Sequence, residues 1–197
     1  SWLGPEDVSF LIGSSGSANA PIEVNAYGEG EAPILSGAIL ASNWTQDTGG
    51  VWKTNIGANI ALVRALYVNN QLKTWAREPD NGWFRTDVGS NSMNITDSQL
   101  SGLGNLVGGY VFRRTHSWAY HETPITSQNG NNIVLGPDHN GSTNTYGPYK
   151  APGESGYTQM PQDGWGYIVE GKRQFIDQPG EWHYDKTTGD LYYYPEG

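Results

Sequence analysis

Short apolar stretches, broken by frequent turn residues, run along the whole chain. Apolar positions almost never recur at the spacing of an amphipathic helix, and 27 glycines and 11 prolines interrupt the pattern. Only residues 97–103 predict a helix, a short one for which Asp97 is the candidate N-cap. The rest of the pattern predicts strands, so we expect an all-β chain.

The first forty residues have a rhythm of their own. Residues 8–12, 22–27 and 33–37 are typical of short strands separated by tight polar turns at nearly even spacing. One coil of a parallel β-solenoid gives this pattern, and so does a meander of antiparallel strands. Periodicity alone does not separate the two.

Beyond these residues the strands lengthen and alternate, as antiparallel hairpins do. Asn69-Asn70 is a good two-residue turn within residues 63–72. Alternating aromatic residues predict a hairpin over residues 181–194, closed at residues 187–190. Three more strands are expected to pair antiparallel in chain order: residues 110–115, 118–127 and 132–135.

The aromatic residues are unusually polar, with 8 Trp and 12 Tyr against 4 Phe. Trp and Tyr combine a large apolar face with a polar edge. Sugar rings offer the matching surface, apolar C–H faces rimmed by hydroxyls. The competing interpretation is that these rings fill the core of a β-protein.

The chain is acidic, with 20 acidic and 11 basic residues and a net charge of −9. Binding to a phosphate backbone needs clustered Lys and Arg, so we expect no nucleic-acid partner. Strongly anionic polysaccharides are disfavoured for the same reason, although a local basic groove overrides net charge. The adjacent basic pairs are Arg113-Arg114 and Lys172-Arg173.

Cysteine is absent, which excludes disulfides and Cys-based metal sites. No apolar run reaches the roughly 18 residues of a membrane-spanning helix, so none is predicted. The chain starts at Ser1 without a methionine, which fits removal of an export signal or of a longer N-terminal stretch. We expect a secreted or cell-surface location.

Two groups of segments resemble a known superfamily. Residues 21–30 (PIEVNAYGEG) and 33–37 (PILSG) look like the opening coil of right-handed parallel β-helix proteins of the pectate-lyase-like superfamily. Residues 76–83 (AREPDNGW) and 177–192 resemble a β-rich insertion that some members carry between early coils. Members include glycoside hydrolases, polysaccharide lyases and secreted repeat proteins.

This resemblance implies a division of the chain into two parts. Residues 1–40 would start a right-handed parallel β-helix, and residues 41–197 would form an antiparallel insertion, sandwich-like or barrel-like. The polar stretch 139–162 predicts a long surface loop within the insertion. A solenoid needs about three repeats to bury its core, so we expect the remainder of the same protein as a partner.

No complete catalytic or metal signature is present. The four histidines are scattered, and Gly-x-Ser-x-Gly is absent. No cofactor is expected, although a Ca²⁺ site of backbone carbonyls would leave no trace in a sequence. In the superfamily, catalytic residues usually lie on later coils, so the resemblance assigns none here. The carboxylates near aromatic residues are Glu122, Asp138, Asp163, Glu170 and Glu181.

The aromatic residues give the clearest binding signal. Trp83 and Trp165 each stand beside glycine in a turn-like context, with Arg77 and Tyr167 close to them in the sequence. We predict that these four residues bind carbohydrate, the rings by stacking. Packing of the insertion against the opening coil is the competing explanation for both tryptophans.

Three functions follow from these observations. The favoured one is recognition of a polysaccharide or oligosaccharide by a module of a secreted carbohydrate-active β-helix protein. An alternative is a glycoside hydrolase or polysaccharide lyase whose active site is completed by later coils. A structural cell-surface module without a ligand is the third.

Overall fold

The structure is a computed structural model that divides into two units, Ser1–Ile39 and Leu40–Gly197. Among the residues that it describes, no helix is long and apolar enough to cross a membrane. The predicted loop over residues 139–162 lies outside them. The described residues are 13, 15–26, 28–31, 36–58, 60, 63–87, 94–114, 120–137 and 164–197.

The described residues of the first unit form no strand. Their regular structure is one isolated antiparallel bridge, and all of them are exposed. The predicted strand is therefore wrong at residues 22–26, where Ile22 and Val24 face solvent. A solenoid coil buries such residues only against neighbouring coils. A β-helix coil over residues 1–40 stays a prediction, since residues 8–12 and 32–35 lie outside the described residues.

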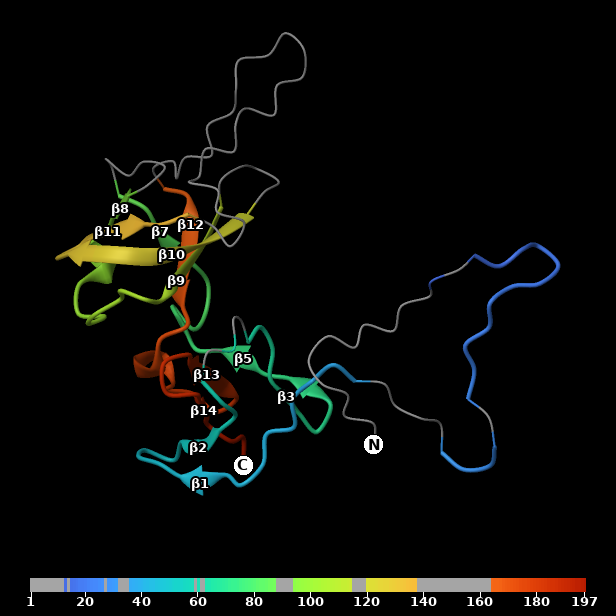
Figure 1. The fold of residues 1–197 in the computed structure, drawn as a ribbon. Coiled ribbons are helices and arrows are strands. Elements are labelled where there is room, and N and C mark those ends of the chain that lie inside the picture. The colour runs from blue at the N-terminus through green and yellow to red at the C-terminus, as the bar shows by residue number, and fades with distance from the viewer. Residues whose placement is uncertain are drawn as a thin grey trace, which may run out of the picture. The chain divides into compact units, whose positions relative to one another are not determined.

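A five-stranded sheet forms one part of the second unit (Figure 1). Tyr184 pairs with Leu191, which confirms the predicted hairpin of residues 181–194. In order across the sheet, the strands are β1 (Thr45–Gln46), β2 (Trp52–Asn55), β14 (Asp190–Tyr193), β13 (Glu181–Asp185) and β5 (Thr74–Trp75). Strands β13 and β5 pair parallel, and all other neighbouring strands of this sheet pair antiparallel.

A small hairpin of β3 (Tyr67–Val68) and β4 (Gln71–Leu72) precedes β5. Asn69 and Asn70 form its turn with φ angles of 51° and 60°. A two-residue hairpin turn of type I′ needs a positive φ angle at both of its central residues, and asparagine adopts positive φ more readily than most residues. The predicted turn is confirmed.

A seven-stranded sheet forms the other part of the second unit (Figure 1). The antiparallel succession predicted for residues 110–135 is confirmed. The edge strands β6 and β8 do not pair with each other in the described residues, so the sheet is not a closed barrel. In order, its strands are β6 (Arg77–Glu78), β12 (Gly166–Glu170), β9 (Tyr110–Arg114), β10 (Tyr120–Asn129), β11 (Asn132–Leu135) and β8 (Asn94–Thr96), with β7 (Phe84–Arg85) also paired to β12.

One face of this sheet is apolar and buried. Successive side chains of a strand point to opposite faces, so Val111 of β9 faces the core while its neighbours Tyr110 and Phe112 face the other way. The buried face packs with residues such as Ile95 and Leu106 in one apolar cluster. The opposite face, here called the outer face, carries the candidate site.

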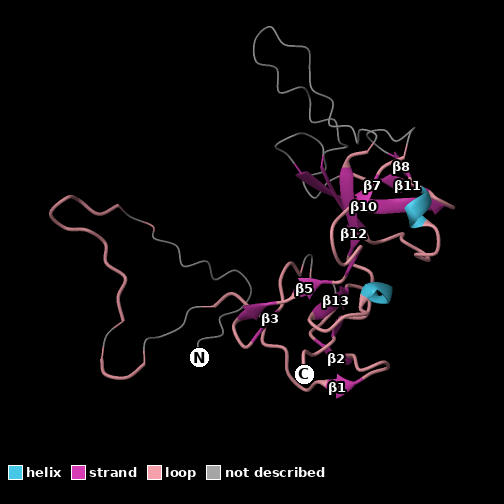
Figure 2. Ribbon diagram, turned by 180° about the vertical axis from the view of Figure 1, so that it is seen from behind, coloured by secondary structure: helices cyan, strands magenta, loops and turns pink. Residues whose placement is uncertain are grey.

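Helical structure is confined to two short 3₁₀ helices in the described residues, η1 (Ser98–Leu100) and η2 (Arg173–Phe175), shown in cyan in Figure 2. The predicted helix at residues 97–103 is thus shorter than expected. Its predicted cap is confirmed, because the Asp97 side chain accepts the Gln99 N–H at 2.8 Å. The all-β prediction is confirmed.

Ala76 joins the two sheets, since it lies between β5 of one and β6 of the other. Its N–H donates to the Trp182 carbonyl at 2.8 Å, and its carbonyl accepts the Gly171 N–H at 2.9 Å. Ala76 is completely buried. These bonds fix the place where the two sheets meet.

Candidate functional site

Three aromatic rings form a cluster on the outer face, which we call the aromatic platform: Trp83, Phe112 and Tyr120. The Phe112 and Tyr120 rings stack with centroids 5.4 Å apart and planes 4° from parallel. The Trp83 ring lies 6.0 Å from Phe112 and 5.7 Å from Tyr120. Trp83 is 39% exposed and Tyr120 47% exposed. The platform is therefore an aromatic surface open to solvent.

The residues around Trp83 hold its ring in place. A Cβ atom on Gly166 would lie only 3.2 Å from the Trp83 Cβ, so this glycine lets the side chain rest directly on β12. Arg77 braces the turn before Trp83, because its Nε donates to the Pro79 carbonyl at 3.0 Å and its Nη2 to the Gly82 carbonyl at 2.9 Å. Arg77 thus positions the platform.

Two glutamates lie beside the platform on the same face of the sheet. Glu122 pairs across the strands with Phe112, and Glu170 pairs with Tyr110, two positions along β9. Glu122 forms an ion pair with Arg64. Burial is the main reason that the pKa of Glu170 is raised to about 7; the charge of Glu122 adds to the rise, and the charges of Arg77 and Arg64 oppose it. One carboxyl of this glutamate pair is therefore largely protonated at slightly acidic pH.

The structure separates the four residues predicted from the sequence to bind carbohydrate. Trp83 is exposed and belongs to the platform. Trp165 is half-buried, with the Arg114 guanidinium 5.7 Å from its ring centroid. Arg77 contacts backbone carbonyls of the turn that presents Trp83.

Tyr167 has a different role from the one predicted. Its ring is completely buried on the core face of β12, and its hydroxyl donates to Asp97 at 2.7 Å. Burial and the bond to Asp97 raise the pKa of the phenol. A ring that solvent cannot reach cannot stack on a sugar, so we correct this assignment: Tyr167 is a core residue.

Phe112 and Tyr120 were missed as site residues. The sequence did carry a signal, the alternation of residues 110–114, which puts Phe112 opposite the buried Val111 and Arg113. The contact of Trp83 with both rings joins segments far apart in the chain, and no local pattern predicts it.

A pocket of about 420 Å³ lies where the two sheets meet. Trp75 of β5, Tyr110 of β9 and His183 of β13 are among its lining residues. Trp75 is half-buried, and its ring stacks on Trp182 with centroids 5.9 Å apart. Burial lowers the pKa of His183 to about 4, so this imidazole is neutral at neutral pH.

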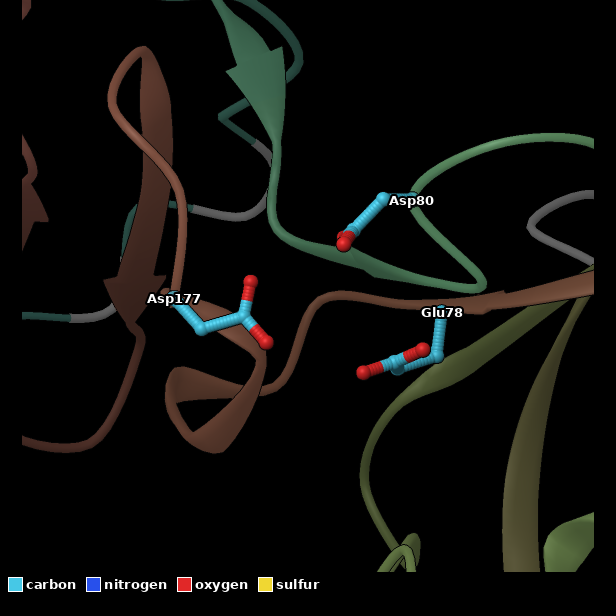
Figure 3. Close-up of side chains that lie close together, drawn as sticks. All are labelled: Glu78, Asp80 and Asp177. Carbon is cyan, nitrogen blue, oxygen red and sulfur yellow. The ribbon is translucent and has the colours of Figure 1, made fainter.

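Three carboxyl groups meet elsewhere in the second unit (Figure 3). Glu78, Asp80 and Asp177 each offer an oxygen atom, and all three lie within 4.8 Å of one another. Burial raises the pKa of Glu78 and of Asp177, and the neighbouring carboxylates add to both shifts. Oxygen donors at this spacing suit a hard cation such as Ca²⁺. Three carboxyls alone do not specify a metal site, so we assign none.

Comparisons with known proteins found one similar fold. No family model and no curated protein matches the chain. A solved structure titled "Glycoside hydrolase" matches 82% of this chain with a TM-score of 0.56 and 16% sequence identity. The chain spans 29% of that protein's length. At this identity the likeness is one of fold, and the all-β architecture described above is thus similar to part of a glycoside hydrolase structure.

Proposed function

We propose that this chain binds a polysaccharide or oligosaccharide on the outer face of its seven-stranded sheet. The observation that supports this most strongly is the aromatic platform, with Trp83 and Tyr120 exposed and the Trp83 side chain resting on Gly166. Soluble proteins seldom leave clustered aromatic rings open to water without a binding role, and two of the three platform rings, Trp83 and Tyr120, are exposed.

The chemistry around the platform suits sugars. Aromatic faces stack on the apolar faces of sugar rings, and each ring contributes on the order of 1 kcal/mol beyond burial. Arg64 and Glu122 at the edge of the platform offer hydrogen-bond donors and acceptors for hydroxyls. We infer a module of a larger, secreted carbohydrate-active protein, and the similarity to part of a glycoside hydrolase structure agrees with this.

Substitution of the platform rings tests the proposal. The chain would be screened against neutral and weakly charged glycans, and Trp83→Ala and Tyr120→Ala would then be compared with Trp52→Ala. Trp52 is the matched control, because it is also 39% exposed but lies on the five-stranded sheet. We expect binding to fall at least tenfold in both platform variants and to stay unchanged in the control. Equal losses in all three variants, or no glycan bound by the wild type, would refute the proposal.

A second candidate function is hydrolysis of a glycosidic bond, and the glutamate pair favours it. Glycosidases use one protonated carboxyl as acid and one carboxylate as base or nucleophile. Glu170, with its pKa raised to about 7, would donate the proton to the leaving oxygen. Glu122, in its ion pair with Arg64, would act as the carboxylate.

Turnover decides between the two candidates. Incubation of the wild type and of Glu170→Gln with each glycan that binds would be followed by product analysis. Hydrolysis by the wild type that is lost in the variant, with binding retained, would establish the enzyme. Binding without any product would leave recognition as the function.

A further inference from the structure

The pocket between the two sheets lies next to the aromatic platform. Tyr110 lines the pocket, and Phe112 of the platform is two residues further along β9 on the same face. Two residues of a strand span about 7 Å. The pocket volume of about 420 Å³ falls within the range of small-molecule sites. A ligand on the platform therefore extends naturally into the pocket.

The pocket is positively charged, although the chain as a whole is acidic. Lys172, Arg173 and Lys186 line it, and Asp185 is its one acidic lining residue among those described. Arg173 forms an ion pair with Asp47. No carboxylate of the described residues lies within ion-pair distance of the other two cations. Two ammonium groups thus remain able to bind an anion.

Lys172 is held in a fixed position at this pocket. Its Nζ donates to the Val107 carbonyl at 2.8 Å. Burial lowers its pKa, because the ammonium group has lost part of its hydration. A partly desolvated cation gains more from a bound anion than one surrounded by water.

Two buried polar groups at the pocket lack partners in the described structure. They are the indole N–H of Trp75 and Nδ1 of His183. Buried polar groups are nearly always hydrogen-bonded in native proteins. Both residues line the pocket, so a polar ligand there would lie against two residues that each carry an unpaired buried polar atom.

We propose that this pocket binds a sugar that carries an anionic group, a carboxylate or a sulfate ester. Lys172 and Lys186 contact the anion, and the rings of Trp75 and Tyr110 contact the sugar. The inference rests on the proposed glycan binding, because it takes the pocket as one end of the surface that begins at the platform. It also narrows the ligand class from glycans in general to those with acidic units.

Matched monosaccharides test the pocket. Ligand-observed NMR titration of the whole chain would compare D-glucuronate with its uncharged methyl ester, D-glucose with its 6-sulfate, and sodium sulfate alone. We expect glucuronate or the sulfated sugar to bind at least tenfold more tightly than its neutral counterpart, the scale of one charge-assisted hydrogen bond. Equal affinity of the charged and neutral sugars would overturn the proposal. So would equally tight binding of sulfate alone, which would indicate a simple anion site.

Charge substitutions locate the binding. Lys186→Gln, at an exposed position, and Lys172→Gln should each weaken binding of the charged sugar about tenfold, with folding checked by Tm. Lys53→Gln, which removes the same charge outside the pocket, should leave it unchanged. Equal weakening by the control would overturn the proposal. If Trp83→Ala abolishes glycan binding but the wild type binds charged and neutral sugars equally tightly, the pocket inference alone fails. If the charged sugar binds through the lysines while Trp83→Ala changes nothing, the platform function alone fails.

Discussion

Tyr167→Phe tests the reassignment of this residue from the binding surface to the core. The substitution removes one hydroxyl, which donates to Asp97 at 2.7 Å, and both residues are completely buried. A hydrogen bond to a charged acceptor contributes about 1.5–3 kcal/mol, and its loss leaves a buried carboxylate oxygen without a partner. For a domain of this size, about 1 kcal/mol shifts Tm by roughly 2–4 °C. We therefore expect Tm to fall by about 3–12 °C.

Thermal and urea unfolding, followed by tryptophan fluorescence, would measure this change. Tyr67→Phe removes the same group from a tyrosine that is 62% exposed, and it should change stability by no more than about 0.5 kcal/mol. Glycan binding by Tyr167→Phe should equal that of the wild type at temperatures where both are folded. Unchanged stability together with lost binding would show that the sequence prediction was right and the reassignment wrong.

Three further predictions concern stability. Because the pKa of Glu170 is raised to about 7 in the fold, the folded state holds its proton more tightly than the unfolded state, and stability should fall between about pH 4.5 and pH 7. Glu170→Gln should flatten this fall in urea unfolding, and an identical slope in the variant would contradict it. Asp177→Asn removes a negative charge beside Glu78, and this charge helps to raise the pKa of Glu78. The substitution should therefore increase Tm at pH 7, where both carboxyls repel each other, but not at pH 3. A lower Tm at pH 7 would refute this repulsion. At Gly189 φ is +81°, and an added Cβ would lie only 2.5 Å from a facing backbone carbon; Gly130 also has a positive φ, but an added Cβ there would meet open space. Gly189→Ala should therefore destabilise the chain by several kcal/mol more than Gly130→Ala. Equal denaturation midpoints of the two variants would show that the clash is relieved.

Local signals predicted the hairpins well. The Asn69-Asn70 turn and the 181–194 hairpin each depend on residues within a short window, where turn chemistry and alternation act together. The Asp97 cap belongs to the same class of short-range interactions. These elements form for reasons that are visible in a few consecutive residues.

The site depends on contacts between distant segments, and those could not be predicted. Trp83 contacts Phe112 and Tyr120 only because β7 and β9 flank β12 in the sheet. Tyr167 was placed on the surface from its position near Trp165, although strand alternation turns it toward the core. Sheet order, not proximity in sequence, decides which rings reach solvent.

The Trp83 indole N–H signal during a glycan titration tests the central claim most directly. In ¹H–¹⁵N spectra the 8 tryptophans give separate indole signals, which single substitutions would assign. With a glycan that binds, we predict that the Trp83 signal shifts with saturation while that of Trp52, equally exposed on the five-stranded sheet, stays in place. A saturating shift of Trp52, with the Trp83 signal unmoved, would contradict glycan binding at the aromatic platform.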